Sequence, residues 1–156
     1  MDEQPVPIGI RIAQIKLLQG RIFEALLKEH LKRELNASQV NILFQLWEED
    51  NISIRELSER SKLAKTTLTS MLDRLEQAGW VKRENNPTNR REVRILLSDG
   101  AFQAEKECYE AFWRMQAINF KGFQEEEKAK LNVLLERLYQ NLAEYEKQEL
   151  QGKTKA

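Results

Sequence analysis

The stretch 54–98 limits the possible fold more than any other part of the chain, because it contains several different local patterns in succession. Ser53 and Glu56 have the Ser-x-x-Glu spacing that satisfies two backbone donors reciprocally at a helix start, which predicts a short helix over Ile54–Ser61. A longer helix is predicted by apolar residues that recur at i, i+3, i+4 and i+7, namely Leu68, Met71, Leu72 and Leu75. Gly79 ends that helix.

Two runs of β-branched and apolar residues come next, Trp80–Glu84 and Val93–Leu97. The turn-forming sequence Asn-Asn-Pro-Thr-Asn-Arg-Arg joins them, so the runs predict a β-hairpin whose tip carries Arg90 and Arg91 on a mobile loop. A short strand around residues 52–54 could pair beside the hairpin. Helix, turn, helix and hairpin in this order are the layout of a winged helix-turn-helix.

The face that the second helix leaves exposed suits the major groove of DNA, where residues in the N-terminal half of a helix can reach base edges. Hydroxyl and cationic side chains occupy this face: Lys65, Thr66, Thr67, Thr69, Ser70 and Arg74. Arg90 and Arg91 suit the narrow, strongly negative minor groove. The helix face could instead be the plain solvated side of an amphipathic helix, but its combination with the hairpin favours DNA contact.

These residues resemble the MarR family of transcriptional regulators. Residues 72–98 are similar to the family's recognition helix and wing, which usually read Asp-Arg-Leu-Glu, then a Gly, two hydrophobic residues and an Arg, then Asp-Pro-x-Asp-Arg-Arg and alternating hydrophobic residues. The long helices predicted before and after this segment also have the family's order and length. The resemblance implies a homodimeric repressor that binds an inverted-repeat operator and that a small aromatic or anionic effector can release.

The chain departs from the family pattern at three positions. Asn86 and Asn89 stand where the family has two wing aspartates, the second of which commonly pairs with the Arg corresponding to Arg91. An Asn can accept a hydrogen bond but supplies no counter-charge. Ala64 stands where the family has a Ser at the start of the recognition helix, so the usual side-chain cap is missing. We expect these changes to alter affinity or sequence preference and to leave the fold unchanged.

Charge is distributed unevenly along the chain. The formal net charge is +0, but residues 60–98 hold 9 Lys and Arg against 4 Asp and Glu, a local net charge of +5. Phosphate binding depends on local charge, so overall neutrality indicates modest non-specific affinity. The neutral total and the missing wing aspartates leave an alternative open, a winged-helix scaffold for protein assembly without sequence-specific DNA binding.

Long amphipathic helices flank the module. Apolar spacing predicts helices from Ile8 to about Glu34 and from Ser98 to about Phe120, and a last helix begins at Glu125–Glu127. Asn36 and Gln39 form a further capping-box spacing, before a helix that runs to about residue 50. The terminal helices have more apolar surface than one small module can cover, which a second copy would bury.

We therefore expect a mainly α fold with a small β-hairpin wing, that is, a winged helix-turn-helix plus a long-helix dimerisation region. Residues 1–35 and 99–150 would form the dimerisation region, and residues 36–98 the DNA-binding domain. Several aromatic residues should lie mostly in the core: Phe44, Trp47, Phe112, Trp113 and Phe120. On the strands, some of Lys82, Arg83 and Arg94 should pair with Glu84 or Glu92.

The sequence has no constellation typical of an enzyme, no phosphate-binding Gly loop and no Cys/His cluster, so we expect no catalytic, cofactor or metal site. Cys108 stands beside Glu107 and Glu110, which would raise its pKa, so an inert thiol is favoured over a redox sensor. No apolar run approaches the roughly 20 residues that span a bilayer, and the N-terminus lacks the order of a signal peptide. We expect a cytoplasmic protein with no membrane partner.

Overall fold

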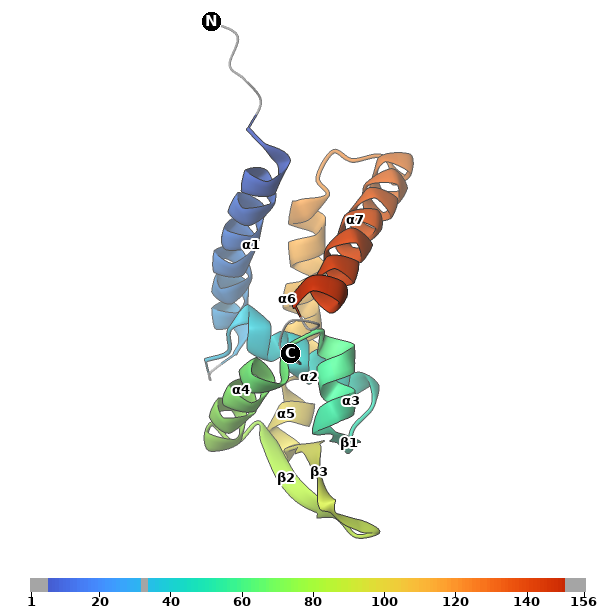
Figure 1. Ribbon diagram of the computed structural model, residues 1–156. Coiled ribbons are helices and arrows are strands. Elements are labelled where there is room, and N and C mark those ends of the chain that lie inside the picture. The colour runs from blue at the N-terminus through green and yellow to red at the C-terminus, as the bar shows by residue number, and fades with distance from the viewer. Residues whose placement is uncertain (1–5, 32–33, 151–156) are drawn as a thin grey trace, which may run out of the picture. The chain divides into compact units, whose positions relative to one another are not determined.

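The structure, a computed structural model, describes residues 6–31 and 34–150 of the chain (Figure 1). Its elements fall into two compact units, residues 1–116 and residues 117–156, which are treated one after the other. In the described residues the first unit holds a cluster of helices with one small sheet, and the second is helical. The predicted fold class, mainly α with a β-hairpin wing, is confirmed.

Helix α1 (Ile8–His30) contributes to the core only through its second half. The side chains that it buries are Phe23, Leu26 and Leu27. Large apolar side chains of its first half are exposed, and Ile8 is 76% exposed. The backbone turns extended at residue 31 (φ −100°, ψ 132°), so the predicted end near Glu34 is wrong.

Helix α2 (Ala37–Glu48) begins with the predicted capping box. Asn36 Oδ1 accepts a hydrogen bond from the Gln39 backbone at 2.9 Å, and Gln39 Oε1 accepts one from the Asn36 backbone at 3.0 Å. Four of its side chains are fully buried: Val40, Ile42, Leu43 and Leu46. Each such burial stabilises the fold by about 2 kcal/mol relative to an exposed side chain.

Helices α3 (Ile54–Ser61) and α4 (Lys65–Gln77) form the helix-turn-helix, and α3 has the predicted bounds. The Ser53 hydroxyl accepts a hydrogen bond from the Glu56 backbone at 3.1 Å, as a helix cap does. The predicted reciprocal bond from Glu56 is replaced by an ion pair with Arg60 at 3.3 Å. The leucines that join these helices to the core are 0% exposed, namely Leu57, Leu68, Leu72 and Leu75.

Helix α4 begins without a side-chain cap and ends at a glycine. Ala64 makes no side-chain cap, as its sequence predicted. Gly79 has φ 73°, a left-handed conformation that suits glycine, and it ends the helix as predicted. The chain then returns at once to the sheet, because the Trp80 backbone N–H donates to the Leu75 carbonyl at 2.8 Å.

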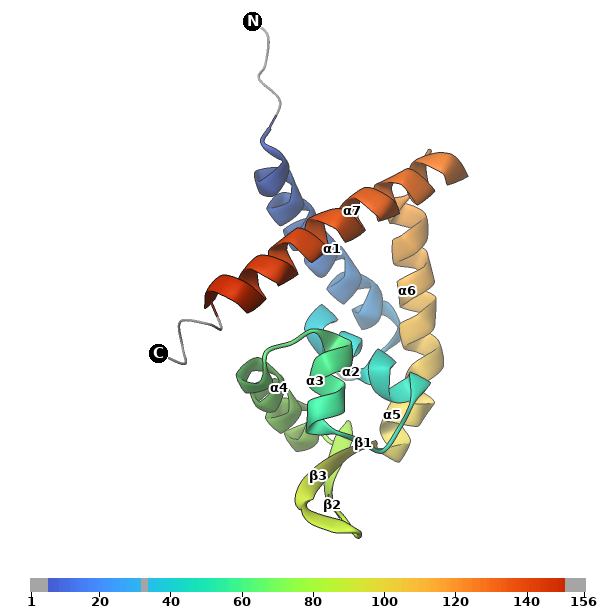
Figure 2. The same ribbon diagram turned by 45° about the vertical axis from the view of Figure 1, so that its right-hand side comes forward.

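An antiparallel sheet with the strand order β1–β3–β2 completes the first unit. Its strands are β1 (Ile52–Ser53), β2 (Val81–Asn86) and β3 (Asn89–Leu97). As predicted, β1 pairs beside the hairpin. The β2–β3 hairpin, called the wing below, projects from the end of this unit opposite the start of α1 (Figure 1, Figure 2).

The wing's turn is shorter than predicted. Asn86 pairs with Asn89 in the strand register, so only residues 87 and 88 remain between the strands. A two-residue connection is the commonest hairpin loop, and it lets the neighbouring polar residues join the strands. Arg90 and Arg91 consequently lie on β3, and their predicted place on a mobile loop at the tip is wrong.

A break divides the helix predicted after the wing into α5 (Asp99–Gln103) and α6 (Glu105–Asn119). Ser98 caps α5, because its hydroxyl accepts a hydrogen bond from the Ala101 backbone at 3.3 Å. The same hydroxyl donates to the Gly79 carbonyl at 2.7 Å. One side chain therefore joins the residue that ends α4 to the helices that follow the wing.

Aromatic rings form a continuous row between α2 and α6. The Phe44 ring centroid lies 4.9 Å from that of Tyr109 and 5.5 Å from that of Phe112. Phe44, Trp47 and Phe112 pack against the core as predicted. Trp113 is 65% exposed, so its predicted core position is wrong, because it points from the side of α6 opposite to that helix's buried residues.

The second unit consists of the end of α6, helix α7 (Glu125–Tyr145) and a π-helical turn, Glu146–Leu150. Gly122, at φ 84°, supplies the left-handed turn before α7, and Phe120 is half-buried against Phe123. Of the 21 residues of α7 none is buried. Its exposed large apolar side chains are Val133, Leu134, Leu135, Tyr139, Leu142 and Tyr145. Within the described ranges, no helix is both long and apolar enough to span a lipid bilayer.

Candidate nucleic-acid interface

The outward face of α4 consists of short hydroxyl side chains between cations. All six residues predicted for this face are exposed: Lys65, Thr66, Thr67, Thr69, Ser70 and Arg74. The opposite face is anchored in the core by the buried leucines of α4. The Thr69 hydroxyl donates its hydrogen to the Lys65 carbonyl at 2.8 Å, so its remaining lone pairs face outward as acceptors. The helix is thus held from behind and presents donors and acceptors in front.

Arg83 on β2 fixes α4 against the sheet. Its guanidinium lies 2.7 Å from Asp73 Oδ1 and 2.5 Å from Glu76 Oε2, so it joins two turns of α4. Burial lowers the pKa of Arg83, and the hydrogen bonds to both carboxylates raise it to a net value above the ordinary one. Arg83 is therefore not among the strand cations that pair with Glu84 or Glu92.

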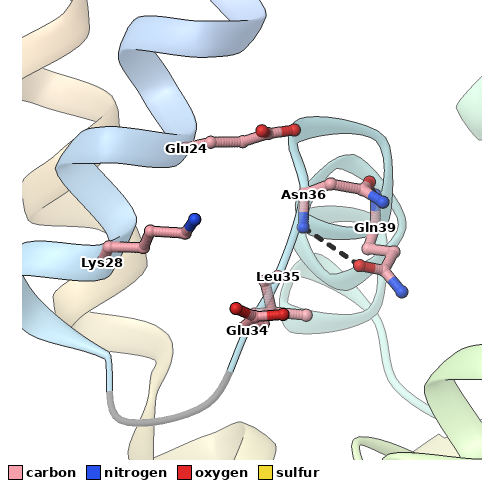
Figure 3. Close-up of a pocket in the computed structure, with 6 residues that line it drawn as sticks. All are labelled: Glu24, Lys28, Glu34, Leu35, Asn36 and Gln39. Atoms are coloured by element: carbon pink, nitrogen blue, oxygen red, sulfur yellow. Dashed lines mark hydrogen bonds between the residues drawn. The ribbon is translucent and has the colours of Figure 1, made fainter.

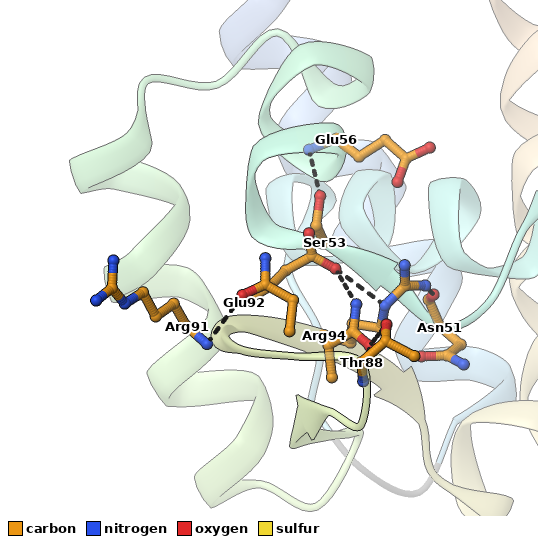
Figure 4. Close-up of polar contacts among 9 residues, drawn as sticks. Asn51, Ser53, Glu56, Thr88, Arg91, Glu92 and Arg94 are labelled. Carbon is orange, nitrogen blue, oxygen red and sulfur yellow. Dashed lines mark hydrogen bonds and ion pairs between the residues drawn. The ribbon is translucent and has the colours of Figure 1, made fainter.

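Arg90 and Arg91 are exposed on the outer part of β3. Asn89 Oδ1 accepts a hydrogen bond from the Arg91 backbone N–H at 3.3 Å, so the bond does not involve the guanidinium. The Arg91 side chain points away from the polar contacts of the wing (Figure 4). Among the residues that the structure describes, neither guanidinium has an acidic partner within 4.0 Å.

A chain of polar contacts runs along the wing (Figure 4). Glu92 Oε1 accepts hydrogen bonds from Asn86 Nδ2 at 2.7 Å and from Arg94 Nε at 3.2 Å. Arg94 Nη1 donates to the Asn51 carbonyl at 2.6 Å. The predicted pairing of a strand arginine with Glu92 is therefore confirmed for Arg94. The contact to Asn51 joins residues 43 apart in sequence, which local patterns could not predict.

A polar pocket of about 270 Å³ lies away from this surface, between α1 and the start of α2 (Figure 3). It is lined by Glu24, Lys28, Glu34, Leu35, Asn36 and Gln39. Two carboxylates against one ammonium disfavour an anion, and sites for small aromatic molecules are mostly apolar. The pocket therefore does not match the anionic aromatic effector that the family resemblance implies.

Cys108 is fully buried in α6. Burial, with a further contribution from the charge of Glu107, raises the pKa of the Cys108 thiol to about 12. The thiolate is the reactive form of cysteine, so at neutral pH this side chain is a protonated core residue.

Comparisons with known proteins agree with this geometry. The MarR family model matches residues 35–93. The regulator PecS of Dickeya dadantii is 33% identical over 145 residues, which cover 91% of this chain and 86% of PecS. The regulator TtmR of Methylorubrum extorquens is 40% identical over 80 residues, which are 51% of this chain and only 40% of TtmR.

Among solved structures, a cysteine-to-serine mutant of MarR from Escherichia coli complexed with operator DNA is similar over 85% of this chain and 94% of that chain. The TM-score is 0.76 and the sequence identity 26%. The regulators matched by sequence are transcription factors and not enzymes. From its match to PecS over nearly the whole length, and from its helix-turn-helix and wing, we conclude that the chain belongs to the MarR family of winged helix-turn-helix transcriptional regulators.

Proposed function

We propose that this regulator binds double-stranded DNA as a homodimer on an inverted-repeat operator and represses transcription from it in the cytoplasm. The observation that carries the proposal is the combination of an exposed, hydroxyl-rich face on α4 with two exposed wing arginines that have no acidic partner among the described residues. Support comes from the similarity of the fold to a MarR protein complexed with operator DNA.

In this proposal α4 occupies the major groove. Thr66, Thr67 and Ser70 can donate to or accept from base edges, and their small size allows the helix backbone to approach closely. Lys65 and Arg74 supply positive charge for phosphates or for guanine. Because the buried leucines fix the helix from behind, these side chains meet the groove at defined positions.

The wing would contact the adjacent minor groove. Arg90 and Arg91 carry charge on a narrow ribbon, and arginine is preferred where a narrow minor groove concentrates negative potential. Their lack of acidic partners in the described residues means that no ion pair has to be broken before DNA binds. Asn89, in place of the family's Asp, contributes to this availability because it brings no negative charge.

The homodimer is proposed from the apolar side chains that the protomer leaves exposed on α1 and α7. Residues 1–35 and 99–150 would form the dimerisation region, and residues 36–98 the DNA-binding domain. Exposed apolar surface of this extent marks a protein interface. A two-fold dimer places its two recognition helices about 34 Å apart, one turn of DNA, which requires an inverted repeat.

We also propose that a small aromatic or anionic effector releases the operator. The surface that supports this is the aromatic row that ends at Trp113, because aromatic rings stack on one another favourably. Such a ligand must bind the released state better than the DNA-bound state. Titration of phenolic acids into the dimer, followed by Trp fluorescence and calorimetry, tests this, and the absence of both heat and DNA release would refute it.

Selection of bound duplexes from a random library tests the main proposal. We expect one enriched inverted repeat whose half-sites lie about one helical turn apart. Recovery of no enriched palindrome would instead support the scaffold alternative.

Replacing Arg91 by Ala tests the wing. We expect operator affinity to fall about fivefold and the slope of log K against log salt to decrease by about 1, since one cation no longer displaces counterions. Lys106→Ala is the control, because it removes an exposed cation from α6. An unchanged slope in Arg91→Ala would exclude the wing from the interface.

A further inference from the structure

The wing of this chain is supported by side chains at positions that the family pattern does not specify. We propose that Glu92 and Arg94 are positioning residues, which hold Arg90 and Arg91 in a fixed place relative to the recognition helix. This inference rests on the proposed function, because it concerns how the wing reaches DNA. Neither residue itself has to contact the duplex.

The contacts form an uninterrupted path. At the turn, Asn86 Oδ1 accepts hydrogen bonds from the Thr88 backbone at 3.0 Å and from its hydroxyl at 2.8 Å. The Asn86 amide then donates to Glu92 at 2.7 Å, and Glu92 accepts from Arg94 at 3.2 Å. Arg94 ends the path on the Asn51 carbonyl at 2.6 Å. The turn of the wing is thereby joined to the backbone just before α3 (Figure 4).

The path crosses the part of the wing that the sheet supports least. Strand β1 pairs with β3 only at Ile95 and Arg94, so beyond Arg94 the wing is a two-stranded ribbon. The register shifts between Asn85 and Asn86, which interrupts the ladder near the turn. An isolated two-stranded ribbon is marginally stable in water. Glu92 joins Asn86, at the interrupted ladder, to Arg94, whose side chain reaches the residue before β1, and this link supports the wing at this place.

Partial burial strengthens the contact between Glu92 and Arg94. The side chains of Glu92 and Arg94 are each 33% exposed, so their charge-assisted hydrogen bonds are partly shielded from water. Asn51 has φ 58°, and Ser53, two residues later, caps α3. A change in the wing's direction would therefore be resisted by the start of the helix-turn-helix. Glu92 supplies within the wing the carboxylate that positions 86 and 89 lack.

Replacing Glu92 by Ala separates positioning from charge, because the two effects have opposite signs. The substitution removes a negative charge from the DNA-facing module and frees Arg94, so electrostatics alone predicts tighter binding. Loss of positioning predicts weaker binding. Glu84→Ala is the matched control, since it removes the same charge from an exposed place on β2 outside the path.

We expect Glu92→Ala to bind the inverted repeat selected by the wild-type chain about fivefold to tenfold more weakly, as for loss of one ordinary hydrogen bond. Glu84→Ala should bind as tightly as wild type or tighter. Glu92→Gln, which keeps an acceptor oxygen, should recover most of the affinity. Hydroxyl-radical protection at the wing's minor groove should be lost in Glu92→Ala, whereas guanine N7 protection beneath α4 persists.

Two outcomes would overturn the inference. One is Glu92→Ala binding as tightly as Glu84→Ala, and the other is equal loss of protection in both grooves. Arg94→Lys is the second variant, because an ammonium cannot reach Glu92 and the Asn51 carbonyl as the guanidinium does, and it should also lose only the wing protection. Both variants should unfold within a few degrees of wild type.

Amide hydrogen exchange in the free protein distinguishes failure of this inference from failure of the proposed function. Exchange over residues 89–92 should be several times faster in Glu92→Ala than in Glu84→Ala, whether or not DNA binds. Unchanged exchange would refute the positioning role. Faster exchange, together with a wild-type chain that selects no duplex, would instead refute the proposed function.

Discussion

Helices α4 and α7 are both amphipathic, yet the protomer treats their apolar faces differently. In α4 the leucines Leu68, Leu72 and Leu75 are 0% exposed, and the residues classed as exposed are all polar. In α7 no residue is buried, and Leu142 is 64% exposed. The same residue type at helical spacing thus fills a core in one helix and covers a surface in the other.

The difference shows which helix is fully packed against its own protomer and which is not. Helix α4 is held by the core and by the Arg83 ion pairs, so its position depends on this protomer alone. The apolar side chains of helix α7 are exposed in the protomer, and the proposed dimer would bury them. In the proposed function, DNA binding and dimerisation are therefore assigned to helices that differ in what surrounds them, and substitutions can separate the two roles.

Leu72→Ala should produce the largest effect. It creates a cavity in the core and should lower the free energy of unfolding by about 3 kcal/mol, measured by urea denaturation. Leu142→Ala is the matched substitution in α7, and in dilute protomer it should cost less than about 0.5 kcal/mol. Similar losses for both leucines would show that the two faces are equally enclosed and would remove the contrast.

Leu142→Arg tests whether the exposed apolar face of α7 forms the dimer interface. An unpartnered cation on the proposed dimer surface should raise the dimer dissociation constant about thirtyfold, or about 2 kcal/mol, by sedimentation equilibrium. Gln140→Arg is the control, since it adds the same group at an exposed polar position of α7. A dimer as tight as wild type in Leu142→Arg would place the interface elsewhere.

The smallest expected effect concerns the enclosed thiol of Cys108. Its pKa is about 12 in the folded chain against an ordinary 9.0, so the neutral form is favoured by folding. The resulting stability is complete below pH 9 and is lost as the pH rises toward 12, because the unfolded thiol ionises first. At pH 10, wild type should have lost about 1.4 kcal/mol more than Cys108→Ala, by urea denaturation across pH. Parallel pH profiles would show that the thiol is open to solvent.

Local sequence signals predicted the helix-turn-helix well. The bounds of α3 and the Asn36 capping box depend on residues close together in sequence. Helix ends set by tertiary contact were predicted less well. The break between α5 and α6 and the early end of α1 have no Gly or Pro to mark them.

In the candidate site, too, features set by local pattern were predicted and features set by tertiary contacts were not. Exposure of Thr66, Thr67 and Arg74 follows from the helical period, so the pattern was sufficient to predict it. The place of Arg90 on a strand depends on the register of two partner strands. The path from Glu92 through Arg94 to Asn51 could not be predicted, because it needs the fold to bring β3 beside the residues that precede α3.

The exposed leucines of α7 also affect how steeply operator occupancy depends on the concentration of such a regulator. If two chains must pair before either recognition helix is presented correctly, operator occupancy rises with the square of the free protomer concentration below the pairing constant. Halving the copy number would then reduce occupancy fourfold, so the strength of one helix face would decide how sharply a gene responds to dilution at cell division.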